Sequence, residues 1–254
     1  MSTNTRTNTR PIYLHEVIFT VPGREEPYMS SVTSLHYDPV RLGEAQSAGI
    51  DGEHYRAFAQ FRTAQTSGPF PNVINIWEMD WKTLARALEV QFQDKARDTG
   101  MEDWWQRNLH LRRGGYDRVL IPAAYSPDGA QLSKRNVRRE VFLHEVVWLP
   151  FGEPERYLGE LEQKLLPAAT KLGVELIGAW RVAMRPRQVL TVFAAPEWSK
   201  FAQFVAAAED DPGLRAWRDY RNKQVVRCEE LVGLTARNNA NAVRRYPASQ
   251  APHA

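Results

Sequence analysis

Two short segments of the chain carry the same pair of ionisable residues. Tyr13-Leu-His-Glu-Val-Ile-Phe19 matches Phe142-Leu-His-Glu-Val-Val-Trp148, so that His15-Glu16 recurs as His144-Glu145. An imidazole that faces a pocket titrates near neutral pH and can serve as a general base or acid. His15 is therefore the first candidate for a catalytic base. A histidine that is repeated together with its strand is also explained as a hydrogen-bonded packing residue, and this alternative stays open.

The two glutamates have a different expected role. Each repeated segment is followed by a landmark that contains an arginine, Arg62 in the first copy and Arg181 in the second. Buried carboxylates are costly unless they are paired. We expect Glu16 to pair with Arg62, and Glu145 with Arg181, in the interior of the fold.

Polar residues present in only one copy are stronger candidates for chemistry, because duplication does not explain them. Asn75 lies in Val73-Ile-Asn-Ile-Trp77, where the second copy has Thr191. A strand amide among apolar neighbours can stabilise an oxyanion, although Asn75 is equally consistent with a surface position. If His15 is the base and shares a pocket with Asn75, then Tyr55 or His54 is the expected proton donor. The candidate substrate-binding residues are Tyr37, His36, Trp77, Glu78 and His110.

Cofactor signals are weak. No HExxH motif, EF-hand loop, P-loop or GxGxxG sequence occurs, so neither a nucleotide nor a preorganised zinc or calcium site is indicated. The single Cys228 has no cysteine partner for a disulfide or a metal site. His110 could be the axial ligand of a heme, which requires a histidine beside a roomy apolar pocket. We expect no cofactor and no metal, and we keep heme as an alternative.

The charge distribution argues against nucleic acid as a partner. The net charge is +3, but nine of the 33 basic residues lie in segments 1–11, 126–139 and 236–254, with one acidic residue. The remaining body has 24 basic and 29 acidic residues, and no basic stripe follows a folded face. The apolar runs are too short to cross a bilayer, and the polar N-terminus lacks a secretory signal. A cytoplasmic location is the expectation.

The elements that must position these residues come from an ordered repeat. Four further landmarks recur after the His-Glu strand, including Val73–Trp77 against Val189–Phe193 and Trp104 against Trp217. Periodicity in the second copy predicts strands over 142–149, 176–184, 188–194 and 225–234, and helices over 154–172, 197–208 and 213–223. The order β-α-β-β-α-β is that of a ferredoxin-like unit. The first copy gives the same order with longer loops at 34–54 and 64–72.

The predicted fold class is α+β: two tandem ferredoxin-like units that pack sheet to sheet as one α/β barrel. The predicted divisions are a flexible arm (1–11), a first unit (12–125), a linker (126–139), a second unit (140–235) and a flexible tail (236–254). The glutamate-bearing face of each sheet is expected to point toward the other sheet. The site is expected in the first unit, between its sheet and its helices and under the two longer loops.

At these residues the sequence resembles the NIPSNAP-like branch of the dimeric α/β-barrel superfamily. The segment from His15-Glu16-Val17 to Pro22-Gly23 is similar to the opening strand and turn of that family, and Asp211-Pro212-Gly213 begins a similar short helix. The resemblance covers about 13–125 and 140–235. The arginine usual two residues after the glutamate is Ile18 in the first copy and Val147 in the second, so a role that depends on that arginine is not implied.

The resemblance implies small-molecule chemistry. The superfamily includes cofactor-independent monooxygenases, polyketide cyclases, muconolactone-type isomerases and heme enzymes, and fold alone does not choose among them. We expect a cofactor-independent lyase, isomerase, cyclase or monooxygenase that acts on an apolar carbonyl, phenolic or polyketide-like substrate. A noncatalytic ligand-binding or scaffold protein is one alternative, and a heme enzyme of the aldoxime dehydratase or peroxidase type is another. The expected partner is a small molecule, with no nucleic acid or membrane and with a possible homo-oligomer.

Overall fold

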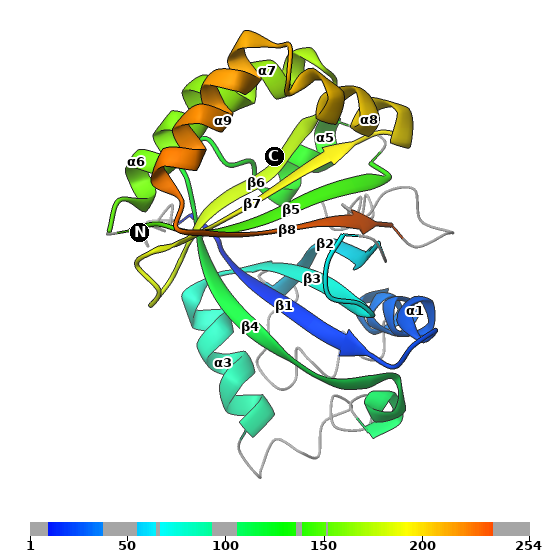
Figure 1. Cartoon of the computed structure of the whole chain (residues 1–254). Coiled ribbons are helices and arrows are strands. Elements are labelled where there is room, and N and C mark those ends of the chain that lie inside the picture. Colours follow the sequence, from blue (N-terminus) through cyan, green and yellow to red (C-terminus); the bar gives the residue numbers. More distant parts are fainter. Residues whose placement is uncertain are drawn as a thin grey trace.

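Eight antiparallel strands close into one barrel in the computed structural model, which describes residues 10–37, 55–64, 67–92, 106–135, 139–150 and 152–235 (Figure 1). The order around the barrel is β1-β3-β2-β8-β5-β7-β6-β4. The strands of the first half are β1 (Ile12–Thr20), β2 (Tyr55–Thr63), β3 (Asn72–Met79) and β4 (Arg112–Pro122). Those of the second half are β5 (Val141–Trp148), β6 (Glu175–Val182), β7 (Gln188–Ala195) and β8 (Arg227–Leu234).

Both halves have the strand order of a ferredoxin-like unit. The order is β4-β1-β3-β2 in the first half and β8-β5-β7-β6 in the second, and β2–β8 and β4–β6 pairs join the halves. The registers also correspond: Glu16 lies opposite Asn75, and Glu145 lies opposite Thr191. The predicted α+β barrel is confirmed, and so is the correspondence of Asn75 with Thr191.

Helices cover the outside of the barrel, as Figure 1 shows. The first half carries α1 (Glu25–Tyr37), α3 (Trp81–Phe92) and the short 3-10 turn η2 (Leu109–Leu111). In the second half, α6 (Pro154–Glu160) and α7 (Leu166–Lys171) are joined by the π-helical turn η3 (Leu161–Leu165), and α8 (Trp198–Ala207) and α9 (Pro212–Gln224) follow. Among the described helices, none combines the length and the apolar character needed to cross a bilayer.

The barrel interior is a packed core. Period-two alternation places one face of every strand inside, where Tyr13, Phe61, Phe142 and Trp180 are almost fully buried. The expected linker 126–139 contains a helix, α5 (Gly129–Arg135), whose Leu132 is fully buried in the same core. This helix therefore contributes to the core of the barrel. Separate apolar clusters fill the space between each half of the sheet and its helices.

The prediction for the faces of the first strands is wrong. His15 and His144 lie in the barrel interior, whereas Glu16 and Glu145 are on the outer face, toward the helices. The expected Glu16–Arg62 and Glu145–Arg181 pairs are consequently not formed. Each arginine instead binds a glutamate of the first helix in its own half: Arg62 pairs with Glu26, and Arg181 with Glu155, both at 3.2 Å.

The chain ends and one long loop fall outside the described residues. Most of the expected arm 1–11, the tail 236–254 and most of the loop 34–54 belong to these segments. The described part of the loop 64–72 lies against the second half, because the Ser67 hydroxyl donates to the Val232 carbonyl at 3.2 Å. This part of the loop therefore contributes to the β2–β8 junction.

Candidate functional site

A polar cluster lies on the helix-facing side of the first half, among apolar side chains packed beneath α1 and α3. Glu16 occupies the middle of β1, where its cross-strand neighbours are Asn75 on β3 and Asp117 on β4. Cross-strand neighbours share a face, so these three side chains project on the same side. Asn75 and Trp77 are almost fully buried, whereas Glu16 is only partly buried and Asp117 is exposed.

Neutral donors hold the carboxylate of Glu16. The indole Nε1 of Trp77 donates to Oε2 at 2.6 Å, and the amide Nδ2 of Asn75 donates to the same oxygen at 3.2 Å. Gln60 donates to the carbonyl oxygen of Asn75 at 2.9 Å, which orients the amide toward Glu16. Desolvation raises the pKa of the Glu16 carboxyl to about 7, despite the two hydrogen bonds that lower it. The carboxyl can therefore exchange a proton near neutral pH.

A tyrosine and an arginine complete this cluster. Tyr28, on α1, is almost fully buried, and hydrogen bonds join its side chain to Asn75 and to Arg112. Burial raises the pKa of Tyr28, so that it remains a neutral hydroxyl. Arg112, at the start of β4, is partly buried and supplies positive charge to the cluster. A carboxyl that exchanges protons therefore lies close to an amide, a phenol and a guanidinium.

The equivalent position in the second half has different chemistry. Glu145 forms a 2.7 Å ion pair with Arg221 of α9, and the Tyr157 hydroxyl donates to Glu145 at 3.4 Å. Thr191 and Phe193 replace the amide and the indole of the first half. Burial raises the pKa of Glu145, and the Arg221 charge opposes that effect. A directly paired arginine makes Glu145 a structural anchor for α9, whereas the described hydrogen-bond donors to Glu16 are neutral.

Three potential metal ligands surround Arg221. One ligand atom each of Glu145, Cys228 and Glu230 lies within 4.8 Å of the others. The guanidinium nitrogen Nη2 of Arg221 is 2.7 Å from Glu145 and 2.7 Å from the sulfur of Cys228, and it also contacts Glu230. A cationic side chain thus lies among these ligand atoms and pairs with both carboxylates.

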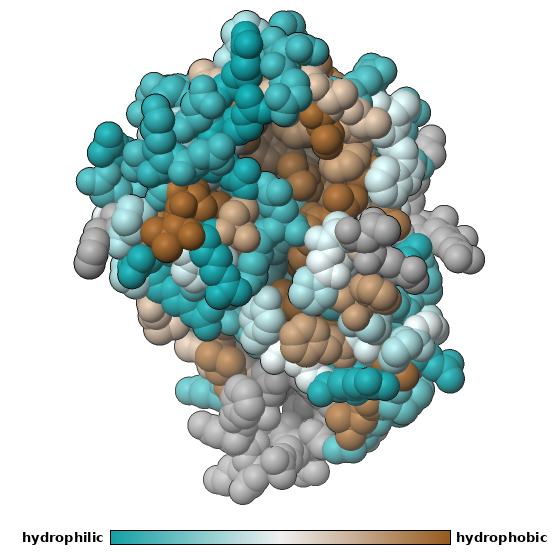
Figure 2. All heavy atoms as spheres, viewed as in Figure 1, coloured by the Kyte–Doolittle hydropathy of each residue, from teal (hydrophilic) through white to brown (hydrophobic). Residues whose placement is uncertain are grey.

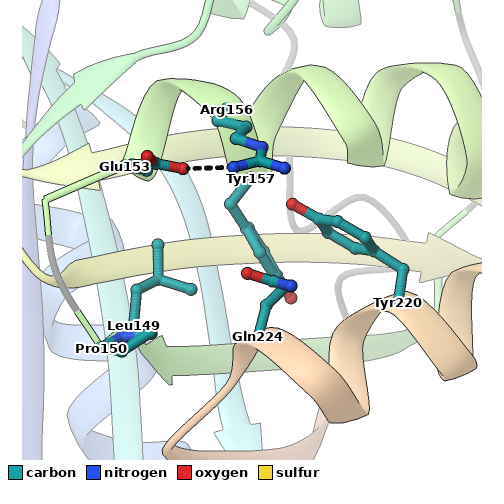
Figure 3. Close-up of a pocket in the computed structure, with 7 residues that line it drawn as sticks. All are labelled: Leu149, Pro150, Glu153, Arg156, Tyr157, Tyr220 and Gln224. Atoms are coloured by element: carbon teal, nitrogen blue, oxygen red, sulfur yellow. Dashed lines mark hydrogen bonds and ion pairs between the residues drawn. The ribbon is translucent and has the colours of Figure 1, made fainter.

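A cavity of about 250 Å³ opens in the second half (Figure 3). It lies between the ends of α6 and α9, and its lining residues are Leu149, Pro150, Glu153, Arg156, Tyr157, Tyr220 and Gln224. Glu153 and Arg156 pair with each other at 2.9 Å. Glu145 does not line this cavity. Figure 2 also shows apolar side chains in a recess between the mostly hydrophilic helices of this half and the strands.

The predicted partnership of His15 with Asn75 is wrong. Asn75 pairs with Glu16 on the outer face, while His15 points into the barrel. There the Nε2 atoms of His15 and His144 are 2.9 Å apart, and the two rings stack with centroids 5.0 Å apart. Both side chains are almost completely buried. The alternative of a hydrogen-bonded packing histidine therefore describes both positions.

The other candidate site residues predicted from the sequence do not lie together. Trp77 lies with Asn75 in the cluster, but Glu78 faces the barrel, where it accepts hydrogen bonds from the Tyr13 hydroxyl at 2.9 Å and the Gly129 amide at 2.7 Å. His110 is exposed on η2. The backbones of His36 and Tyr37 end α1 and that of Tyr55 begins β2, but their side chains, like all of His54, lie outside the described residues.

The heme alternative finds no support in the described histidines. His110 is exposed, and His15 and His144 contact each other inside the packed barrel. None of the three lines the described cavity. An axial ligand beside a roomy apolar pocket is thus missing from the described part of the chain.

Sequence reasoning did not single out Glu16 as a candidate acid–base residue, and it also missed Tyr28 and Gln60. The i, i+2 spacing of Asn75 and Trp77 was a usable signal, because it places two side-chain donors on one face of a strand. Such donors need an acceptor. On the first strand, the carboxylate of Glu16 lies on the face opposite to His15 and is such an acceptor.

Comparisons with known proteins identify the fold. No family model matches the sequence, and no curated protein does. A protein from Fusobacterium nucleatum, provisionally named a monooxygenase, is 6% identical with a TM-score of 0.59, over 89% of this chain and 93% of that one. An anthrone oxidase-like protein is 8% identical with a TM-score of 0.54, over 89% and 92%. A protein provisionally named a chlorite dismutase is 13% identical with a TM-score of 0.51, over 92% and 98%.

These matches cover nearly the whole of both chains, so the entire barrel is the shared feature. The chain has the α/β-barrel fold of these monooxygenase-like and chlorite dismutase-like proteins. At 6–13% identity the likeness extends to the fold and not to the reaction.

Proposed function

We propose that the chain is a cofactor-independent enzyme that uses Glu16 to remove a proton from an apolar carbonyl, phenolic or polyketide-like small molecule. The proposal rests on the environment of the Glu16 carboxyl. It is partly accessible, neutral donors hold it, and its pKa is raised to about 7. A general base is most effective when its pKa lies near the working pH.

The neighbouring residues suit the charge that such a step creates. Removing a proton beside a carbonyl places negative charge on the oxygen, and preorganised donors stabilise that charge. The amide of Asn75, the hydroxyl of Tyr28 and the guanidinium of Arg112 belong to one connected network around Glu16. Isomerases, cyclases and cofactor-independent monooxygenases share this proton abstraction, so the role of Glu16 is the same for all three.

We favour the monooxygenase type, for which the names of two fold neighbours offer support. In that reaction the deprotonated substrate is oxidised by O2. For an anthrone, the ring methylene becomes a carbonyl: one oxygen atom enters the product, and the other leaves as water with the two methylene hydrogens. Membership of the NIPSNAP-like branch is part of the proposal, based on the segment from His15 to Gly23.

Oxygen uptake with an anthrone as the probe tests the proposal. We expect turnover by the wild type and a loss of at least about 100-fold in kcat/KM for Glu16→Gln, since general-base catalysis contributes about 10²–10⁴-fold. Glu145→Gln is the matched control at the equivalent position of the second half, and it should retain the kcat/KM of the wild type. Equal activity of Glu16→Gln and the wild type would exclude Glu16 as the base.

A second measurement distinguishes a monooxygenase from an isomerase or cyclase. A wild type that removes the acidic proton of the probe without taking up O2 would be an isomerase or cyclase. Solvent deuterium incorporation into the recovered probe detects that outcome, and it too should be lost in Glu16→Gln. Ligand binding with neither O2 uptake nor exchange would instead indicate a noncatalytic binding protein.

A further inference from the structure

Arg118 lies inside the barrel, and no described acidic residue forms an ion pair with it. Arg118 on β4 pairs in register with His15 and is 6% exposed. Its neighbour on the same inner face, Leu120, belongs to the interior core. Arg118 is thus on the opposite side of the sheet from the Glu16 cluster, and the proposed reaction does not use it.

The charge of Arg118 is not compensated by the described residues. Its Nε and Nη1 atoms are inaccessible and have no hydrogen-bond partner among those residues. Two described carboxylates on the inner face have other partners, since Glu78 binds Tyr13 and Gly129, and Glu229 pairs with Arg227. The ring of Tyr116 lies 4.7 Å from the guanidinium carbon. Such a cation–π contact offsets only part of the cost of burying an unpaired ion.

The neighbouring histidines do not neutralise the charge and are not charged themselves. Desolvation lowers the pKa values of both His15 and His144, and the charge of Arg118 lowers them further. The pair shares one Nε2–Nε2 hydrogen bond, which requires one ring to donate and the other to accept. Their Nδ1 atoms are buried and lack partners among the described residues. In the tautomers that allow the shared bond, the ring that accepts at Nε2 carries its proton on Nδ1.

We propose that the barrel interior binds a monovalent anion of halide size at Arg118, beside the His15–His144 pair. One fixed positive charge balances one negative charge, and a dianion would leave excess charge among apolar side chains such as Val17 and Phe61. The dense packing of the interior favours a small anion. The N–H groups on Nε and Nη1, to which no described residue is hydrogen-bonded, are the donors from which the anion would accept.

Thermal unfolding of the full chain in bromide tests the site. The unfolding midpoint is measured in sodium gluconate while bromide replaces gluconate at constant ionic strength. A ligand that binds only the folded state raises the midpoint by mass action, so we expect a rise of several degrees that follows bromide concentration. Arg118→Met keeps the length of the side chain without the charge and should lose this dependence.

Arg113→Gln provides the matched control, because Arg113 is an exposed arginine on the same strand. It should keep the full bromide dependence. Equal midpoints in bromide and gluconate, or an undiminished dependence in Arg118→Met, would overturn the proposal. Should Arg118→Met fail to fold, anomalous diffraction from wild-type crystals soaked in bromide decides the question. A peak within hydrogen-bond distance of the Arg118 guanidinium supports the site, and ordered water alone at that position refutes it.

Discussion

His15 and His144, which are 129 residues apart in the chain, are joined at the centre of the barrel by an Nε2–Nε2 contact of 2.9 Å. They occupy equivalent positions of β1 and β5 in the two halves. The contact therefore lies where the pseudo-twofold relation of the halves brings identical residues together. A histidine pair of this kind links the halves, and its removal should affect the folded state before it affects any reaction.

The first prediction concerns stability. His15→Ala and His144→Ala should each destabilise the protein by about 2–4 kcal/mol, because each leaves a cavity and an unsatisfied buried ring. Chemical denaturation should show similar decreases in the free energy of unfolding for the two variants. At a temperature where both remain folded, their turnover should stay close to that of the wild type. The double variant should cost less than the sum, since the second substitution removes a ring that has already lost its partner. Additive losses would show that the rings do not interact.

The second prediction concerns acid stability. The folded-state pKa of His144 is lowered to about 3 and that of His15 is also lowered, so both are below the value of about 6.5 in the unfolded chain. The unfolded state then binds more protons below pH 6.5, and stability is lost as the pH falls. Between pH 7 and pH 5 the loss is up to about 2 kcal/mol per histidine.

Equilibrium unfolding at pH 7 and pH 5 measures this effect. Carboxyls with raised pKa values, such as Glu16, act in the opposite direction, because they favour the folded state as the pH falls. A His15→Gln/His144→Gln double variant isolates the histidine contribution and should lose less stability than the wild type over this interval. If the double variant and the wild type lost the same free energy of unfolding between pH 7 and pH 5, the histidines would not be buried as neutral rings.

The fold could be predicted because it depends on signals that are local in sequence. Period-two alternation in β1 and β5, together with ordered landmarks such as Trp77 and Phe193, specifies strands and their order independently of long-range contacts. The closure of the barrel could be predicted because each duplicated sheet has helices on one face only, and the two sheets can cover each other's remaining faces. Helix α5 was missed, since Gly129–Arg135 is short and its basic residues are also typical of a linker.

The orientation of the strands could not be obtained in the same way. Both faces of β1 mix polar and apolar residues, so alternation alone does not show whether His15 or Glu16 points inward. The deciding contacts are distant in sequence: His15 meets His144, and Glu16 meets Trp77. An expectation that buried carboxylates pair with arginines selected the wrong face, because in the first half an indole and an amide take that role.

The third prediction separates Glu78 from the site. Its carboxylate accepts hydrogen bonds from the Tyr13 hydroxyl and from the amide of Gly129, at the start of α5. Glu78→Ala should destabilise the chain by about 1–3 kcal/mol, because both buried donors lose their acceptor. The KM of the anthrone probe should not change. A raised KM with unchanged stability would return Glu78 to a substrate-binding role.

The last prediction concerns the pH dependence of the reaction. Glu16 acts as a base only when it is ionised, so kcat/KM should rise with pH through an apparent pKa of about 7. Trp77→Phe introduces the residue type found at the equivalent Phe193 and removes the donor 2.6 Å from the carboxylate. Losing a donor to the charged form raises the pKa, by about 1, so activity should fall near pH 7 and recover toward pH 9. Trp198→Phe, at an exposed indole, should leave the profile unchanged. A Trp77→Phe profile that is lower at every pH but has the same midpoint would show that the indole packs against the substrate and does not set the proton affinity of Glu16.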